Sequence, residues 1–350
     1  MRLVVVTQHV DPAHPALAAT VPKIRALCAR ADEVVVLALG SVPASLPANC
    51  RVKTFGARTR LGRGLRFATA LLPELLRRPR PAGVLAHMCP VYAVLAAPVA
   101  RPLGVPVVLW YTHWRSTAML RLAVRVSSRV ISVDRRSVPI STAKVRGIGH
   151  GIDLAEFPFG EPRGRAGTLR ALSLGRTSAA KGLSAVLRAV RLARAAGVDV
   201  SLDVRGPSLT TEERAHRLEL ERLVVELRLE GCVTIGDAVS REQVPVLFAS
   251  ADVLVNNMRA GAPDKVVYEA GAACLPVLAS NPVFDELLGG FEPPLRFERE
   301  RPEQLAERLA ALAALSPEHR AELGAALHDR VAAGHSVESW ADGALAALHG

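Results

Sequence analysis

The chain has 350 residues, a length that suggests about two domains, and half of its residues are hydrophobic. With only 22% charged residues it can bury a sizeable core, so the composition excludes a globally disordered protein. Residues 1–160 hold 22 Lys and Arg against 7 Asp and Glu, a net charge of +15, and residues 161–350 hold 22 against 26, a net charge of −4. The basic half predicts contact with nucleic acid, an anionic lipid surface or an anionic substrate, unless it is simply a solvated face.

The sequence has few features that indicate a signal peptide, disulfide bonds or a membrane span. The apolar start at residues 3–6 is too short for a signal peptide. The five cysteines show no metal-like spacing, and their odd number indicates a reducing, cytoplasmic compartment rather than a disulfide framework. The longest uncharged run, residues 81–100, contains Pro90 and Pro98, so we expect a buried strand and a helix there rather than a membrane span.

The first half of the chain alternates short apolar runs with longer amphipathic ones. Helices are predicted between the strands, for example at residues 19–31 and 65–77. Repeated strand–helix units with apolar strands predict a parallel sheet that is covered on both faces. The predicted strands are residues 3–7, 33–39, 51–55, 84–87, 105–111, 129–133 and 144–149.

Residues 157–168 are rich in proline, glycine and charge, and we interpret them as an interdomain linker. The alternation then restarts, so the predicted fold class is α/β, with two Rossmann-like doubly wound domains facing across a cleft. The predicted domains are residues 1–160, residues 161–334, and a C-terminal helix, 335–350, that returns to the first domain. The predicted strands here are 169–174, 201–206, 232–235, 253–256 and 276–279. The predicted helices are 183–196, 211–229, 241–250, 265–273 and 302–315, followed by a mostly helical tail, 317–348.

An anion site is predicted where the first strand of the second half ends. Gly175 follows the strand, Arg176 and Lys181 stand five positions apart, and Gly182 precedes a helix. A helix N-terminus offers unpaired N–H groups and a positive dipole end, and the two cations suit a diphosphate. The alternative is that both cations are solvated loop charges.

Several motifs, in order along the chain, together resemble the family-4 retaining glycosyltransferases of the GT-B fold, in a bacterial branch. Residues 7–11, 87–92 and 109–113 resemble segments of that family's acceptor domain. The other motifs are Gly149-His150-Gly151-Ile152-Asp153 with Phe157, Gly175-Arg176 with Lys181-Gly182, and Glu269-Ala270 with Pro276-Val277.

The resemblance implies a nucleotide-diphosphate-sugar donor bound by residues 161–334. Arg176 and Lys181 match the pair that neutralises the donor diphosphate, where negative charge develops as the bond to the anomeric carbon breaks. Glu269 matches the glutamate that hydrogen-bonds the ribose, which suits a carboxylate because it accepts from two hydroxyls. The remaining expected donor contacts are Gly175, Gly206, Val239 in the turn 237–239, Asp264 and Lys265.

The resemblance also implies an acceptor bound mainly by residues 1–160. His113 matches a histidine near the transferred sugar, although a lone histidine is more often structural, and with Arg176 and Lys181 it completes the expected catalytic set. His9, Asp11 and His150 are weaker candidates on the acceptor side, and Gly149 and Gly151 are expected to serve backbone turns.

No cofactor and no metal are expected, since fixed cations can replace a metal and the chain has no Asp-x-Asp tripeptide. The expected partners are the nucleotide sugar and a glycan or lipid-linked acceptor. Arginines interleave with apolar residues around 61–76, which predicts peripheral contact with an anionic membrane, on its inner face.

The chain departs from the family pattern at three places. Gly261 stands where a first glutamate is common, Cys274 stands where a glycine is usual, and residues 9–20 lack glycine. Either another group such as Asp264 replaces the lost carboxylate, or the sugar specificity differs, or activity is low.

The sequence is also compatible with other functions. A sugar-nucleotide epimerase or a phosphorylase could share the fold, and the loss at Gly261 would suit a non-catalytic partner subunit. Nucleic-acid binding is disfavoured, because aromatic residues make up only 4% of the chain and no recognition motif occurs.

Overall fold

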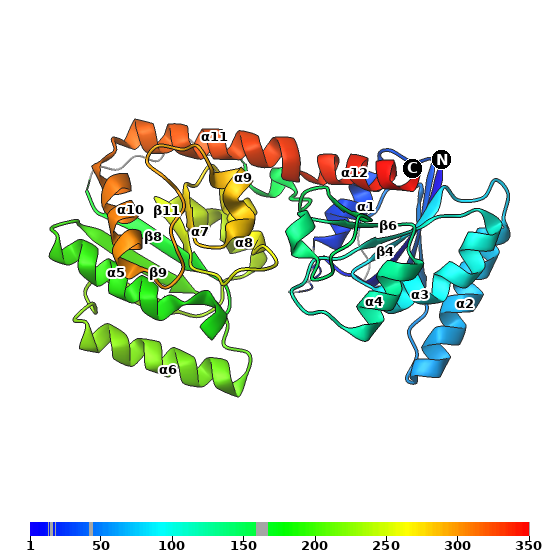
Figure 1. The fold of residues 1–350 in the computed structure, drawn as a ribbon, viewed down its shortest axis with the longest axis horizontal. Helices are drawn as coiled ribbons and strands as arrows, with labels where there is room; N and C mark the ends of the chain where they lie inside the picture. Colours follow the sequence, from blue (N-terminus) through cyan, green and yellow to red (C-terminus); the bar gives the residue numbers. More distant parts are fainter. Residues whose placement is uncertain (13, 15–16, 18, 42–44, 159–166, 350) are drawn as a thin grey trace. The chain divides into compact units, whose positions relative to one another are not determined.

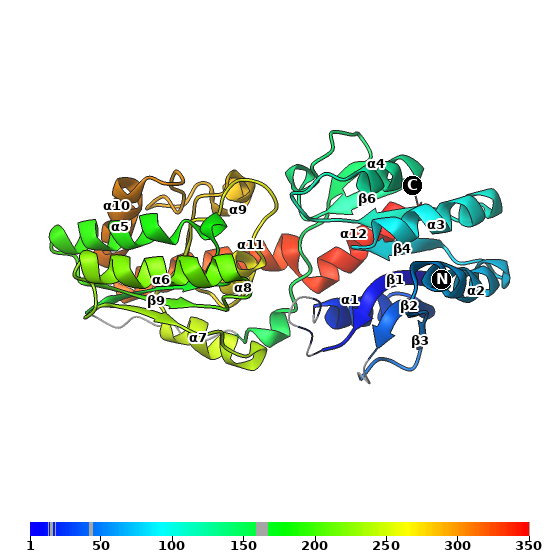
Figure 2. The same ribbon diagram turned by 90° about the horizontal axis from the view of Figure 1, so that it is seen from below.

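In a computed structural model of the chain, the described residues are 1–349 except 13, 15–16, 18, 42–44 and 159–166. The chain forms two compact units, shown in Figures 1 and 2. The first unit is Met1–Asp153 with Gly334–Gly350, and the second is Leu154–Ala333. Each unit has a parallel sheet between helices, which confirms the predicted fold class of two Rossmann-like doubly wound domains.

The first unit is built on a seven-stranded parallel sheet in the order β3-β2-β1-β4-β5-β6-β7. Its central strands are rich in valine, leucine and alanine and are buried on both faces, as expected for a sheet with helices on each side. The strands are β1 (Arg2–Val10), β2 (Glu33–Ser41), β3 (Cys50–Thr54), β4 (Gly83–His87), β5 (Val107–Trp110), β6 (Arg129–Ser132) and β7 (Val145–Gly147).

Helices cover the two faces of this sheet unequally. On one face α2, α3 and α4 enclose a core around Phe55, Phe67 and Tyr92, and on the other α1 packs against α12 (Figure 1). The predicted return of the C-terminal helix to the first unit is therefore confirmed. The helices are α1 (Thr20–Cys28), α2 (Arg60–Leu76), α3 (Pro90–Ala100), α4 (Ala118–Val126) and α12 (Val337–His349).

The second unit contains a five-stranded parallel sheet in the order β10-β9-β8-β11-β12. The strands are β8 (Leu169–Leu174), β9 (Val200–Arg205), β10 (Val233–Gly236), β11 (Val253–Asn256) and β12 (Val277–Ala279). The helices are α5 (Leu183–Ala195), α6 (Thr211–Glu226), α7 (Val244–Ser250), α8 (Lys265–Ala272), α9 (Asp285–Leu288), α10 (Pro302–Ala314) and α11 (Pro317–His335).

Several predicted elements differ from the structure at their ends, and in three the physical reason or the change of structure is clear. Helix α2 begins at Arg60 rather than at 65, because the Thr59 side chain caps it by accepting from the backbone N–H of Gly62. The predicted helix 241–250 is a 3-10 turn over its first three residues, with α7 following. The helical tail breaks at Ser336, which forms a β-bridge with Ile152.

Most of the predicted linker, residues 159–166, lies outside the described residues. Phe157, which was expected to open the linker, is instead buried against Phe248 in the second unit, with ring centroids 5.9 Å apart. Among the helices that the structure describes, none is long and apolar enough to cross a membrane. Residues 81–100 form β4 and α3, as predicted.

Candidate functional site

The end of β8 and the start of α5 form the first part of the candidate site. Gly175 ends the strand, a 3-10 turn at Ala179–Lys181 follows, and Gly182 precedes the helix. Lys181 is only 8% exposed, and its ammonium group donates to the carbonyl of Leu174 at 3.1 Å. The carboxyl edge of such a parallel sheet is where α/β proteins bind ligands, so this loop holds a fixed positive charge at a favourable place.

Asp264, at the start of α8, pairs with the ammonium group of Lys181. It also accepts a hydrogen bond of 2.9 Å from the side chain of Asn256, at the end of β11. Next to it, the side chain of Asn257 donates to the carbonyl of Gly182 at 2.9 Å. The ends of two neighbouring strands are thereby tied to the start of α8.

Arg176 extends further into solvent, with a side chain that is 59% exposed. Its guanidinium group lies 3.2 Å from Oε1 of Glu213, the carboxylate near the start of α6. Glu213 is itself fixed, because it accepts from the backbone N–H groups of Leu209, at 2.8 Å, and Thr210. Both predicted phosphate-binding cations are therefore paired with carboxylates in this structure.

Glu269 lies on α8 and is 5% exposed. Its Oε1 lies 2.6 Å from the ammonium group of Lys265, one helical turn earlier, and 2.5 Å from the guanidinium group of Arg241. Burial alone would raise the pKa of this carboxyl group, but the two cations outweigh it and hold the pKa of Glu269 below its ordinary value. Glu269 is therefore an ionised hydrogen-bond acceptor at neutral pH.

Gly206 follows β9 and touches the loop after β8. A Cβ atom at this position would lie 2.0 Å from the carbonyl oxygen of Gly175, so only glycine allows the two loops to approach this closely. Val239 is half-buried in the loop between β10 and the 3-10 turn at 241–243, and its neighbour Asp237 points away to pair with Arg217.

Two of the three departures from the family pattern, Gly261 and Cys274, have positive φ. Gly261 has φ of +130°, a conformation that side chains rarely adopt, and its carbonyl accepts from Asn281 at 3.3 Å. Cys274 has φ of +56°, in the left-handed region that glycine favours. A glutamate at 261 would be strained in this backbone, whereas a glycine at 274 would relieve strain.

In the first unit, His113 follows β5. Its Nδ1 accepts a hydrogen bond of 3.0 Å from the backbone N–H of Arg115, and its ring stacks on Trp114 with centroids 5.6 Å apart. Burial, and next the charge of Arg115, lower the pKa of His113 below its ordinary value. The ring is therefore neutral at pH 7, and with Nδ1 accepting, the proton resides on Nε2 as a hydrogen-bond donor.

The weaker acceptor-side candidates lie at the same edge of the first sheet. His9 lies near the end of strand β1, with its ring stacked on that of His14 at a centroid distance of 5.5 Å, and Asp11 follows the strand. His150 stands after β7 between Gly149 and Gly151, whose φ angles of +80° and +77° fit the predicted turns.

Four residues of the site were not predicted. Asn256 and Asn257 are visible in retrospect as a polar pair that closes an apolar strand, and Thr210-x-x-Glu213 is a capping-box pattern. Nothing in the sequence pairs Arg241 with Glu269, because the two are 28 positions apart. In the part of the chain that the structure describes, no group of three or more His, Cys, Asp or Glu side chains could hold a metal ion.

Comparison with solved structures identifies the fold. A sucrose-phosphate synthase from Thermosynechococcus elongatus is 19% identical, with 98% of this chain and 96% of that chain covered at a TM-score of 0.71. HepE from Anabaena, in complex with UDP-glucose, is 17% identical over 98% of each chain, at a TM-score of 0.68. A glycosyltransferase from Rickettsia africae is 12% identical over 99% of this chain and 97% of that chain, at 0.73. The chain therefore has the GT-B fold of glycosyltransferases.

Comparison with protein families adds a match within the second unit. Residues 162–328, nearly the whole second unit, match the family described as glycosyl transferases group 1. The matched segment includes the loop of Arg176 and Lys181 and the helix of Glu269. No curated protein sequence matches the chain significantly.

Proposed function

We propose that this protein is a glycosyltransferase that moves a sugar from a nucleotide-diphosphate sugar to an acceptor hydroxyl, with retention of the anomeric configuration. The bond between the anomeric carbon and the diphosphate oxygen breaks, and a bond to the acceptor oxygen forms on the same face of the sugar. The acceptor proton passes to the leaving diphosphate. No carboxylate stands out as a nucleophile, so the proposal includes no covalent glycosyl-enzyme.

The observation that carries the proposal is the pair Arg176 and Lys181 beside the start of α5. The ammonium group of Lys181 is held against Leu174, and the guanidinium group of Arg176 reaches into solvent, where a diphosphate can meet both. Fixed cations stabilise the charge that develops on the leaving group. For this reason the proposed reaction needs no catalytic metal.

Two carboxylates support the remaining donor contacts. Glu269, ionised and held in one orientation by Lys265 and Arg241, suits the ribose hydroxyls. Asp264, anchored by Asn256, is the carboxylate near the donor sugar that replaces the one missing at Gly261. The Anabaena HepE structures contain UDP and UDP-glucose, which makes a uridine nucleotide the first donor to try.

The acceptor is proposed to bind the first unit, near His113. Its Nε2–H can donate to a sugar or acceptor oxygen, and His9, Asp11 and His150 lie at the same edge of the sheet. A glycan or lipid-linked acceptor of the cell envelope fits the basic charge of this unit.

The test is nucleotide release from a panel of nucleotide sugars, with and without candidate acceptors. We expect Arg176→Ala to lower turnover by about 10²–10³-fold, as for the loss of one donor to a developing anion. Arg188→Ala is the matched control, since Arg188 is an exposed arginine on α5 outside the loop, and it should keep normal turnover. Normal turnover in Arg176→Ala would contradict the proposal.

The same assay distinguishes a transferase from an epimerase, which is the main alternative. An epimerase would convert its nucleotide sugar with no acceptor present, whereas a transferase needs the acceptor for sugar-linked product. A protein that binds a nucleoside diphosphate but releases nothing from any donor would be a non-catalytic subunit.

A further inference from the structure

Among the residues that the structure describes, helices α2, α3 and α4 carry most of the large apolar side chains that are exposed. They cover one face of the first sheet side by side, with α3 packed against both others (Figures 1 and 2). Among the described residues, fifteen large apolar side chains are exposed, and nine of them lie on these helices. The nine, which we call the α2–α4 face, are Leu61, Leu65, Leu72, Leu76, Val91, Leu95, Val99, Met119 and Leu122.

Helix α2 has more apolar surface than it needs to pack on its own sheet. Its inner stripe, with Phe67, Leu71 and Leu75, is buried against the sheet. Its exposed leucines recur at helical spacing in a second stripe, about 110° around the helix from the buried one, where Leu61 is 86% and Leu65 is 66% exposed. A surface helix needs one apolar stripe to pack on its own sheet, so the second stripe marks an interaction surface.

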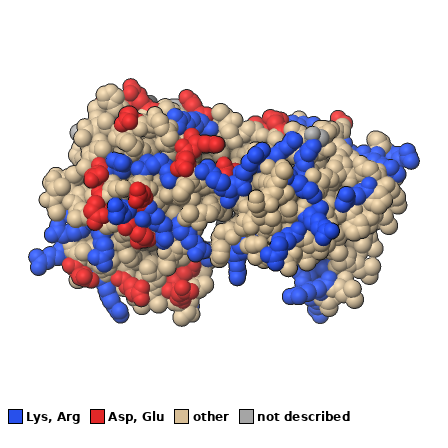
Figure 3. Space-filling view, in the orientation of Figure 1, with Lys and Arg blue, Asp and Glu red and all other residues tan. Residues whose placement is uncertain are grey.

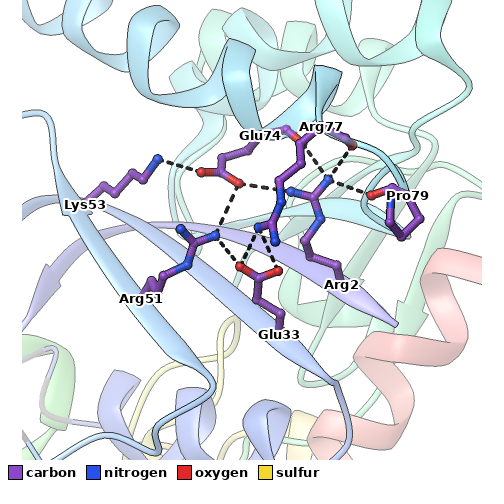
Figure 4. Close-up of polar contacts among 7 residues, drawn as sticks. All are labelled: Arg2, Glu33, Arg51, Lys53, Glu74, Arg77 and Pro79. Atoms are coloured by element: carbon purple, nitrogen blue, oxygen red, sulfur yellow. Dashed lines mark hydrogen bonds and ion pairs between the residues drawn. The ribbon is translucent and has the colours of Figure 1, made fainter.

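The charge on this face has one sign. Residues 34–133 contain 14 Lys and Arg and a single acidic residue, Glu74. Glu74 is buried and neutralised, because it lies 3.1 Å from Arg2 and 2.6 Å from Lys53 (Figure 4). The three helices therefore expose no carboxylate, and Figure 3 shows only basic charge at their place in the lower right.

Arginines stand among the exposed apolar side chains. Arg60 and Arg66 flank the leucine stripe of α2, and Arg121 and Arg125 are exposed on α4. In the described part of the chain, none of the four has a carboxylate within ion-pair distance. Their charge is therefore available to an external anion.

A hollow of about 430 Å³ opens between the ends of α3 and α4. Its lining is apolar except for one cation, Arg101. Such a lining matches an acyl chain or glycerol backbone beside a phosphate group. The lining residues are Ala97, Pro98, Arg101, Pro102 and Val126.

We propose that the α2–α4 face docks on the surface of an anionic lipid membrane, with its leucines in the headgroup region and its arginines on lipid phosphates. Exposed leucines interleaved with arginines are the pattern of helices that lie in a membrane interface. A second copy of the chain is a poorer occupant, because a symmetric contact would oppose two arginine-rich faces without carboxylates. Nucleic acid would use the arginines and leave the leucines without a role.

This inference deepens the proposed function, since it places the enzyme where a lipid-linked acceptor resides, but it is tested without any sugar transfer. The full chain is mixed with vesicles of phosphatidylcholine alone or of equal parts phosphatidylcholine and phosphatidylglycerol, and the bound fraction is measured by co-flotation. We expect binding to the anionic vesicles only, and weaker binding at higher salt. Nucleotide release is assayed separately, so either proposal can fail alone.

Two double variants separate the contribution of the leucines to vesicle binding from that of the arginines. Leu61→Ser with Leu65→Ser should weaken partition by about tenfold or more, because two exposed leucines no longer enter the interface. Arg60→Glu with Arg66→Glu should weaken it by more than about 25-fold, since each basic residue near an anionic surface is worth about fivefold. The matched control is Leu218→Ser with Val225→Ser on α6, where the side chains are 55% and 59% exposed, and it should bind normally.

All variants change exposed side chains, so thermal unfolding should stay at the wild-type temperature and confirms that each protein is folded. Equal binding to both vesicle types would overturn the proposal, as would equal loss in the α6 control. If the wild-type protein bound no vesicles but formed a dimer that the leucine variant dissociates, the face would be assigned to a second copy of the chain. Binding to duplex DNA that needs only the arginines, again without vesicle binding, would assign it to nucleic acid.

Discussion

Glu213 pairs with the guanidinium group of Arg176, which we propose contacts the donor diphosphate. The contact is partly exposed, with the Arg176 side chain 59% open to solvent, so it is worth no more than about 1 kcal/mol. In the proposed function a donor diphosphate displaces this contact, which lowers the affinity by about fivefold at most.

We predict that Glu213→Gln binds a nucleoside diphosphate more tightly, by up to about fivefold, as measured by titration calorimetry. Glutamine keeps the capping box with Thr210, so the start of α6 should be preserved while the competing charge is removed. Glu212→Gln, at the exposed neighbouring position, is the control and should leave the affinity unchanged. Weaker binding in Glu213→Gln would mean that the carboxylate assists the ligand.

The His113 ring offers a hydrogen-bond donor at Nε2 and an acceptor at Nδ1, and the bond from Arg115 holds the ring in place. A glutamine can place a donor near the position of Nε2, whereas an asparagine can replace only Nδ1, the acceptor for the backbone N–H of Arg115. We predict that His113→Gln retains more turnover than His113→Asn in the sugar-transfer assay. The opposite order would assign His113 a purely structural role.

The same residue predicts the pH dependence of the reaction. Because the pKa of His113 is lowered, the neutral ring persists below the ordinary pKa of about 6.5. As the pH falls through the lowered pKa, Nδ1 becomes a donor facing the N–H of Arg115, and turnover should fall. We therefore expect kcat/KM to be flat near neutral pH and to decline only in more acidic buffer, with no such His-dependent decline in His113→Gln.

At the scale of elements, the turn between α8 and β12 carries a residue in an unfavourable conformation. Cys274 has φ of +56°, which costs a non-glycine residue about 1–2 kcal/mol. Glycine removes this cost but gains freedom in the unfolded chain, so Cys274→Gly should raise the free energy of unfolding by a net 0.5–1 kcal/mol, roughly. Cys232→Gly is the control, since Cys232 is also half-buried but has no positive φ, and it should destabilise.

The regular elements were largely predictable from the residues. Strand β8 and strand β11 have the predicted bounds, because their apolar runs end at Gly175 and at the polar pair Asn256–Asn257. Helix α2 begins earlier than predicted, because the cap at Thr59 starts it even though Gly62 and Gly64 are poor helix formers. Local pattern thus fixes the interior of an element better than its ends.

The candidate site was predictable only in part. The cations at 176 and 181 stand in one short motif, and Glu269 was recognised from its resemblance to a family. Their partners Glu213, Asp264 and Arg241 come from separate strand–helix units, and only the folded sheet brings them near. Ion pairs between distant segments leave no periodic signal in the sequence.

At the scale of the whole molecule, the chain completes its first unit with its last helix. Trp340 of α12 is 1% exposed and stands edge-on to Trp110 of β5, with ring centroids 5.6 Å apart. The ammonium group of Lys23, from α1, lies 5.0 Å from the Trp340 ring. The first unit is therefore fully packed only when its C-terminal segment is in place.

We predict that Trp340→Ala destabilises the first unit by about 3–5 kcal/mol. Hydrogen exchange measured by mass spectrometry should show lost protection in residues 1–153, with residues 154–333 unchanged. Trp114→Ala is the matched control, because Trp114 is 50% exposed, and it should change stability by no more than about 0.5 kcal/mol. Equal loss of protection in both units would show that they unfold as one body.

The most direct test of the account is a crystal structure of this protein with a bound nucleoside diphosphate or nucleotide sugar. We predict diphosphate oxygens within hydrogen-bond distance of the Arg176 guanidinium and the Lys181 ammonium groups, with Glu269 on the ribose. Glu213 and Asp264 should then have released the two cations. A nucleotide bound elsewhere, with neither cation in contact with its phosphates, would contradict the account.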